Sequence, residues 1–161
     1  MKHVQQMIDQ HSGFEAVRTS YLRLESPPFM RLVIEVIGGP YPNDAYEVSV
    51  AHYAEQNGDA MRDPEITFLV VPAAEGTTWT PLTFENSYLG AYQVVAEVNS
   101  EGLIKVKHSQ AMNDLRDFAN QWDHNLKQQG FMAVFQRQYG DQNGATHATT
   151  VTRQGDGPQG Q

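Results

Sequence analysis

Between residues 30 and 107 the chain is built from short segments in which apolar side chains recur at every second position. In an extended strand, successive side chains point to opposite faces. A two-residue period of apolar side chains therefore predicts β-structure rather than helix. The alternating segments cover residues 30–37, 46–53, 65–71, 91–98 and 103–107. Turn-rich stretches such as GGPYPND separate them. Because strands this close in sequence connect most simply as hairpins, we expect an antiparallel sheet.

After the strands, the apolar spacing changes to that of an amphipathic helix. From Met112 to Leu126 the apolar residues form one stripe at intervals of three and four, which predicts a helix over residues 110–129. The same spacing predicts a short N-terminal helix from Lys2 to about His11. Strands followed by a helix indicate an α+β fold. We expect an antiparallel sheet of about five or six strands with the long C-terminal helix packed on one face.

Two segments are less regular than the others. Residues 14–26 fit either a continued helix or a strand. Residues 79–84 fit a short edge strand, because Pro81 lacks the N–H group that a central strand needs. The predicted core consists of Leu32, Ile34, Val48, Val50, Phe68, Val70, Val94, Leu115, Phe118, Trp122 and Leu126.

The length and composition suit one globular domain. The chain has 161 residues, of which we assign 1–138 to a single α+β domain. Residues 139–161 are rich in Gly, Gln and Thr and are predicted to be a disordered tail, because they bury too little apolar surface to offset their ordering entropy. The chain has no cysteine, which excludes disulfides and thiolate chemistry. The polar start and the lack of a long apolar run lead us to expect a cytoplasmic protein without a membrane span.

Negative charge gathers in the middle of the chain. From Glu35 to Glu101 there are eleven acidic residues and one basic residue, Arg62, so this segment has a net charge of −10. The formal net charge of the whole chain is −8. A field of one sign favours cationic partners and repels phosphate backbones. We therefore expect an acidic outer face of the sheet, a protein partner with a basic surface, and no direct binding of nucleic acid.

The densest group of functional side chains lies in residues 52–65, which are predicted to form a loop between two strands. The motif AHYAEQNGDAMRDPE in this region resembles that of an uncharacterised family of small proteins carried on plasmids, conjugative elements and phages. Weaker matching segments are MRLVIEVIG, WTPLTFENSYLGAYQ and WDHNLKQQGF, so the resemblance covers about residues 14–132. It implies a mobile-element context and no particular activity.

Three interpretations of the loop are open. In the first, Asn57 and Gly58 form a turn with positive φ, Asp59 and Asp63 accept backbone N–H bonds, and Arg62 pairs with a carboxylate. In the second, the loop recognises a protein partner, because function concentrates in loops held by rigid sheets. The candidate partner-binding residues are Glu55, Asn57, Asp59, Arg62, Asp63, Glu65 and Trp79. In the third, oxygen and imidazole ligands for a divalent metal come from His52, Glu55, Asp59 and Asp63.

Two functions follow from these interpretations. The first is a non-catalytic acidic interaction protein of a mobile element, which binds or inhibits a basic protein that handles nucleic acid or serves in defence. It needs no cofactor. The alternative is a metal-dependent hydrolase or nuclease that uses the His52, Glu55, Asp59 and Asp63 cluster. No phosphate-binding glycine loop, serine nucleophile elbow or H-E-x-x-H motif is present to favour catalysis.

Overall fold

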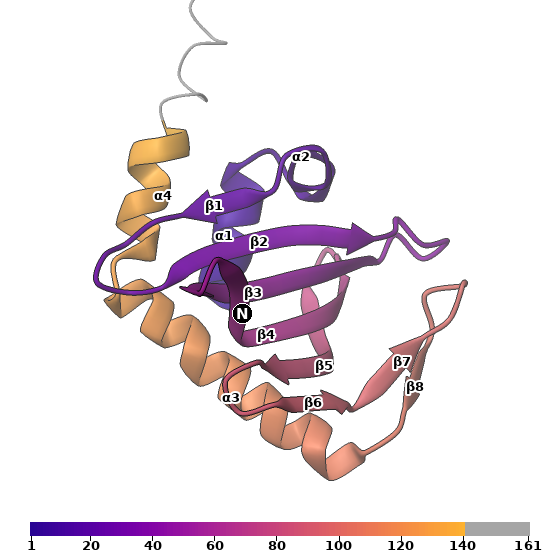
Figure 1. Ribbon diagram of the computed structural model, residues 1–161. Helices are drawn as coiled ribbons and strands as arrows, with labels where there is room; N and C mark the ends of the chain where they lie inside the picture. The colour runs from indigo at the N-terminus through magenta and orange to yellow at the C-terminus, as the bar shows by residue number, and fades with distance from the viewer. Residues whose placement is uncertain (141–161) are drawn as a thin grey trace, which may run out of the picture.

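Six antiparallel strands form a meander in which each strand pairs with its neighbour in sequence (Figure 1). The computed structural model describes residues 1–140, so the predicted tail lies outside the described residues apart from Tyr139 and Gly140. The strands of this sheet are β1 (Leu22–Leu24), β2 (Arg31–Gly38), β3 (Tyr46–Gln56), β4 (Asp59–Val71), β5 (Thr78–Asn86) and β6 (Ala91–Val94). The predicted antiparallel sheet is confirmed. The ambiguous residues 14–26 contribute a helix and then the strand β1.

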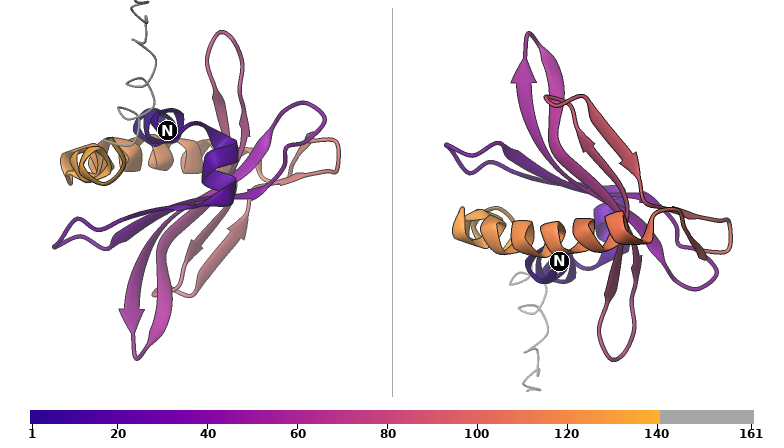
Figure 2. Two further views of the ribbon diagram at one scale, coloured as in Figure 1. Left: turned by 90° about the horizontal axis from the view of Figure 1, so that it is seen from above. Right: turned by 90° about the horizontal axis from the view of Figure 1, so that it is seen from below.

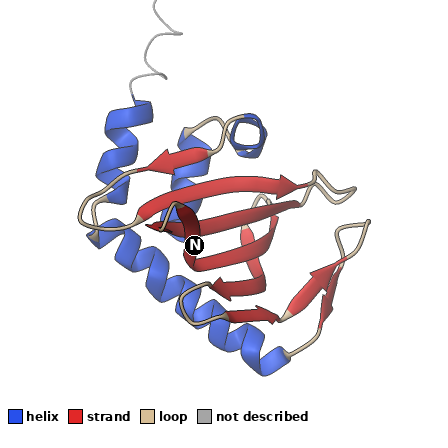
Figure 3. Cartoon of the chain, viewed as in Figure 1, coloured by secondary structure: helices blue, strands red, loops and turns tan. Residues whose placement is uncertain are grey.

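Helices pack against one face of this sheet (Figures 2 and 3). They are α1 (Lys2–Gln10), α2 (Phe14–Thr19), α3 (Ser109–Gln128) and α4 (Phe131–Tyr139). Apolar residues of all these helices join strand residues such as Leu32, Val50 and Phe68 in one buried cluster. We call this the covered face. The α+β class, with a long helix across one face and a short N-terminal helix, is confirmed.

The other face of the sheet is only partly covered. At one end, Leu69 and Leu82 pack with Ala45 and Ala96 in a second, smaller buried cluster. No helix among residues 1–140 packs on the remainder. Because opposite residues of antiparallel strands point to the same side, the strand register identifies the side chains on this part of the face, of which Ser49 and Ala51 are themselves buried. We call it the open face, and it carries Arg23, Arg31, Val33, Glu35, Ser49, Ala51, Tyr53, Arg62, Glu65, Thr67, Thr83, Glu85 and Tyr92.

The last predicted hairpin leaves the main sheet. Residues 91–98 break at Val95 into β6 and β7 (Ala96–Val98), and β7 pairs with β8 (Ile104–Val106) in a separate two-stranded sheet. The buried Val95 donates its N–H to Leu82 O (2.8 Å) and accepts the Lys107 N–H (2.9 Å), which turns the chain away from the sheet. The prediction that residues 103–107 belong to the main sheet was wrong, because the alternation runs through this one-residue break.

The segment predicted as an edge strand is β5, which lies between β4 and β6. Its pairing with β6 covers only Thr83–Asn86, so Pro81 lies in the half that β6 does not reach and its missing N–H does no harm. The predicted edge position was therefore wrong for the second half of the strand. Trp79 lies on the covered face, where its ring contacts Phe68 and its Nε1 donates to Gln5 Oε1 (3.0 Å).

Two residues of the predicted core lie elsewhere. Phe118 is 45% exposed at the rim of α3, where its ring packs edge-on against Phe84. Val94 is half-buried, and the neighbouring Val95 is fully buried in its place. The other predicted core residues are buried. Helix α4 continues to Tyr139, whose ring centroid lies 4.9 Å from that of His11.

The helical layer is joined by a buried carboxylate. Asp123 of α3 is 4% exposed, and its oxygens accept the backbone N–H groups of His3 (3.0 and 3.1 Å) and Val4 (3.1 Å) at the start of α1. His3 Nδ1 lies 3.0 Å from the same carboxylate. The first N–H groups of a helix have no partner within the helix, and a carboxylate there is also favoured by the helix dipole. Asp123 therefore caps α1 from a distant part of the chain.

Replacing Asp123 with Ala should lower the free energy of unfolding by about 2 to 4 kcal/mol, because it removes a cap and leaves buried N–H groups without an acceptor. The matched control is Asp117→Ala, since Asp117 lies on the exposed side of the same helix. That change should cost less than about 0.5 kcal/mol. Denaturant unfolding of both variants measures the difference. Equal losses would contradict the capping role of Asp123.

Candidate functional site

The predicted central loop is a hairpin arm. Strands β3 and β4 continue through it and pair up to Gln56 and Asp59. Asn57 (φ 54°) and Gly58 (φ 86°) form the turn between them, as predicted from their tolerance of positive φ. The prediction of a loop was wrong for the flanking residues. Residues 54–61 extend past the pairing of β3 with β2 and are mostly exposed to water on both faces. They therefore lack the alternation of apolar and polar residues from which a strand is predicted.

The acidic residues of the arm do not converge on one point. Glu55 lies opposite Ala60 on the open-face side, whereas Asp59 lies opposite Gln56 on the other side. The side chains of Glu55 and Asp59 have no hydrogen bond or ion pair with another residue in the range 1–140. Asp63 accepts the Asn86 side-chain N–H (2.5 Å), rather than the backbone N–H bond that was predicted.

Arg62 is the centre of a network on the open face. Its guanidinium lies 3.0 Å from Glu65 Oε2 and 3.3 Å from Glu85 Oε2, and its Nε donates to the Tyr53 hydroxyl (3.4 Å). The pKa of Arg62 is raised mainly by the hydrogen bond to Tyr53, and the two carboxylates raise it further. The Arg62 backbone exchanges hydrogen bonds with Ser87. The predicted pairing of Arg62 with a neighbouring carboxylate is confirmed for Glu65, and Glu85 is a further partner that was not predicted.

A second arginine flanks Tyr53 on its other side. The guanidinium carbons of Arg31 and Arg62 both lie 6.0 Å from the centre of the Tyr53 ring. With their neighbours in the strand register, these side chains form a row across the open face from β1 to β6. We call this row the Tyr–Arg band, and it consists of Arg23, Arg31, Tyr53, Arg62, Glu65, Glu85 and Tyr92.

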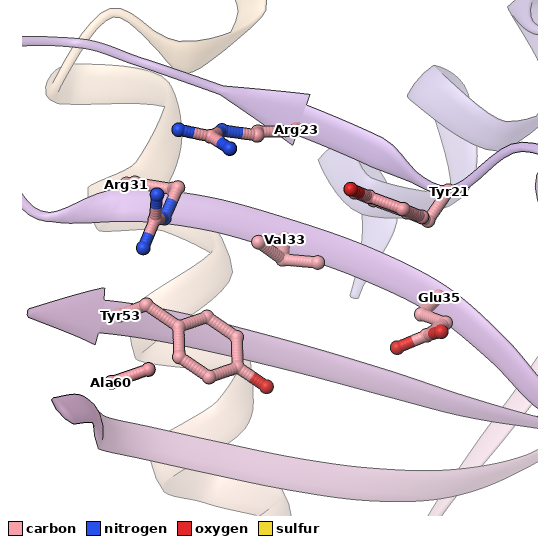
Figure 4. A pocket seen from close by; sticks show the side chains of 7 residues that line it. All are labelled: Tyr21, Arg23, Arg31, Val33, Glu35, Tyr53 and Ala60. Carbon is pink, nitrogen blue, oxygen red and sulfur yellow. The ribbon is translucent and has the colours of Figure 1, made fainter.

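A shallow pocket lies at the β1 end of the Tyr–Arg band (Figure 4). Its volume is about 260 Å³. The lining side chains come from β1 and the residue before it, from β2 and from the β3–β4 arm, and they are Tyr21, Arg23, Arg31, Val33, Glu35, Tyr53 and Ala60. Figure 4 shows Arg31 and Glu35 on β2 at opposite ends of the pocket, with Val33 between them. The pocket therefore has a basic end, an apolar floor and an acidic end.

Sequence reasoning did not single out most of the band. Of its members only Arg62 and Glu65 were predicted as site residues, and Arg23, Arg31 and Tyr53 were not. These three come from different strands, so only the register brings them together. The available signal was the alternation of residues 31–37, which places Arg31 and Glu35 on the same face.

The alternative metal ligands also lie apart. His52 points into the core on the covered face, where its ring centroid lies 5.4 Å from those of Trp122 and Phe131. Burial lowers the pKa of His52, which favours the neutral ring. Glu55 belongs to the opposite face. Residues 1–140 contain no group of three or more His, Asp or Glu side chains placed to hold a metal ion.

The comparisons with known proteins identify a family. A family model described as a domain of unknown function, DUF6908, matches residues 2–132. The chain belongs to the DUF6908 family. No curated protein and no solved structure matches it. Within residues 1–140, no helix is long and apolar enough to cross a membrane.

The buried His52 predicts a dependence of stability on pH. Burial holds its folded-state pKa below the ordinary value of 6.5, so below about pH 6.5 the unfolded chain binds a proton that folded His52 does not. His52 therefore makes the free energy of unfolding fall as the pH is lowered, by up to about 1.4 kcal/mol per pH unit.

Replacing His52 with Gln should remove this contribution. The stability difference between wild type and His52→Gln, measured by denaturant unfolding from about pH 8 to 5, should then shrink as the pH falls. His124→Gln is the control, because His124 is exposed on α3. Its difference from wild type should stay nearly constant. A constant difference for His52→Gln would show that folded His52 takes up a proton as readily as the unfolded chain.

Proposed function

We propose that this DUF6908 protein is a non-catalytic interaction domain that binds a partner protein through the Tyr–Arg band. The observation that carries the proposal is the row of Tyr and Arg side chains on a sheet face that the helices of residues 1–140 leave uncovered. Tyr and Arg are the residues that most often dominate binding energy at protein interfaces. They offer large contact areas together with directional hydrogen bonds.

Exposed apolar side chains extend the band at the β5–β6 turn. Tyr92 is 67% exposed, and beside it in sequence Tyr88 is 48% and Leu89 77% exposed. Two large side chains at the turn and one on the adjoining strand β6 supply apolar area that a bound partner would remove from water. Together with the hydrogen-bonding groups around Arg62, they resemble the mixture of apolar and polar contacts in transient interfaces.

The charge of the chain supports a partner with a basic surface. The protein carries a formal net charge of −8, and residues 35–101, which build most of the sheet, carry −10. An acidic field accelerates encounter with a basic protein and disfavours nucleic acid. With the resemblance to proteins of mobile elements, this leads us to propose a cytoplasmic partner that handles nucleic acid or serves in defence, which the protein binds or inhibits.

The test is to capture the partner from host lysate with the full chain, purify it, and measure Kd for variants by calorimetry. Arg62→Ala and Tyr92→Ala should each weaken binding by about 30-fold, the effect expected of a residue that dominates an interface. Added salt should also weaken the wild-type complex, because the acidic surface is screened.

Matched controls lie away from the band. Arg116→Ala on α3 and Leu103→Ala in the β7–β8 turn remove one half-exposed Arg side chain and one exposed apolar side chain. They should leave Kd within about twofold of the wild-type value, as is usual for residues outside the contact. If the band variants bind as tightly as wild type while a control variant fails, the interaction surface lies elsewhere.

A further inference from the structure

The pocket at the β1 end of the band has the size and shape of a site for a few side chains. Its volume of about 260 Å³ is below that of a typical small-molecule site. Tyr21 and Arg23 form one wall, Tyr53 and Ala60 the opposite wall, and Val33 the floor between them (Figure 4). A groove of this kind suits a segment of polypeptide better than a whole cofactor.

The charges in the pocket are only partly compensated. Arg23 lies 3.0 Å and Arg31 4.0 Å from the same oxygen of Glu25, so one exposed carboxylate serves two guanidinium groups. Arg62, in contrast, has two carboxylates of its own. At the other end, the Glu35 side chain has no ion pair or hydrogen bond with any residue that the structure describes. The pocket therefore presents a surplus positive charge at one end and a free carboxylate at the other.

The spacing of these charges matches the repeat of an extended chain. Arg31, Val33 and Glu35 lie at alternate positions of β2, so their side chains share one face and the two charged residues are about 13 Å apart. A second extended segment laid along β2 has the same repeat. Its alternate side chains therefore meet Arg31, Val33 and Glu35 in register.

We propose that this pocket binds an extended segment of the partner protein with an acidic, an apolar and a basic side chain at alternate positions. The acidic side chain lies between Arg31 and Arg23, where the Tyr53 ring holds the Arg31 guanidinium. The apolar side chain packs on Val33, and the basic side chain pairs with Glu35. This inference rests on the proposed function, because it assigns one part of the partner to one part of the band.

Synthetic peptides test the proposal without the partner. The probe is the blocked heptapeptide Thr-Asp-Thr-Val-Thr-Lys-Thr, and the comparison peptides carry Asp or Lys at both charged positions. Each is titrated into the full ¹⁵N-labelled chain, and chemical shifts of the β1, β2 and β3 amides report binding. The mixed-charge peptide should bind about 2- to 5-fold tighter than either comparison peptide, as one additional exposed ion pair allows.

A charge swap supplies the decisive comparison. In Glu35→Lys the preference should reverse, so that the Asp/Asp peptide binds tighter than the mixed peptide. Glu75→Lys is the control, because it makes the same change in net charge at an exposed turn outside the pocket. It should keep the wild-type preference. An unchanged preference in Glu35→Lys, or the same reversal in Glu75→Lys, would overturn the proposal.

The peptide test and the partner test fail separately. If partner binding depends on Arg62 and Tyr92 but the peptides show no charge preference, the pocket inference falls and the proposed function stands. If the peptides behave as expected but the captured partner ignores the band variants, the pocket binds such segments and the proposed use of the whole band is wrong.

Discussion

A buried carboxylate joins the first helix of the chain to the third. Asp123 accepts two N–H groups at the start of α1, and this fixes α1 beside α3 on the covered face. The contact joins residues about 120 positions apart in the chain, so it ties the two ends of the domain together. Because the apolar residues of α1 and α3 belong to the same core, the polar contact determines how the helical layer is arranged. Because the helices form a single layer on the covered face, the open face stays accessible for binding.

One-sided burial explains why the open face holds the candidate site. On the covered face, side chains such as Phe68 and Trp122 are committed to packing. On the open face, Arg31, Tyr53 and Arg62 are held by hydrogen bonds and ion pairs to strands that the core makes rigid. Their ion pairs are partly exposed, so each adds little to stability. Their contribution is to fix the orientation of groups that a partner would meet, which lowers the entropic cost of binding.

The elements were predictable where one local rule governs them. Alternation predicted β2 and β3, and the apolar stripe predicted α3, because each element buries one side. Prediction failed at Val95, where hydrogen bonds to Leu82 and Lys107 turn the chain out of the main sheet. It also failed in the β3–β4 arm, where the strands pair without burying an apolar face. At the site, Arg62 stood out as the lone cation of an acidic segment. Its companions Arg31 and Tyr53 did not, because cross-strand register cannot be read from one strand alone.

The overall charge of the protein and the arginine charges at the candidate site have opposite signs and act over different distances. The acidic middle of the chain forms most of the sheet, yet β1 and the start of β2 add Arg23 and Arg31 to its open face. The net charge acts over distances up to about the Debye length, which is about 8 Å at physiological ionic strength and longer in low salt. The arginines act at contact distance, where Tyr53 and Glu25 orient them. An acidic protein can in this way attract a basic partner by its overall field and still select it by a local contact of the opposite sign.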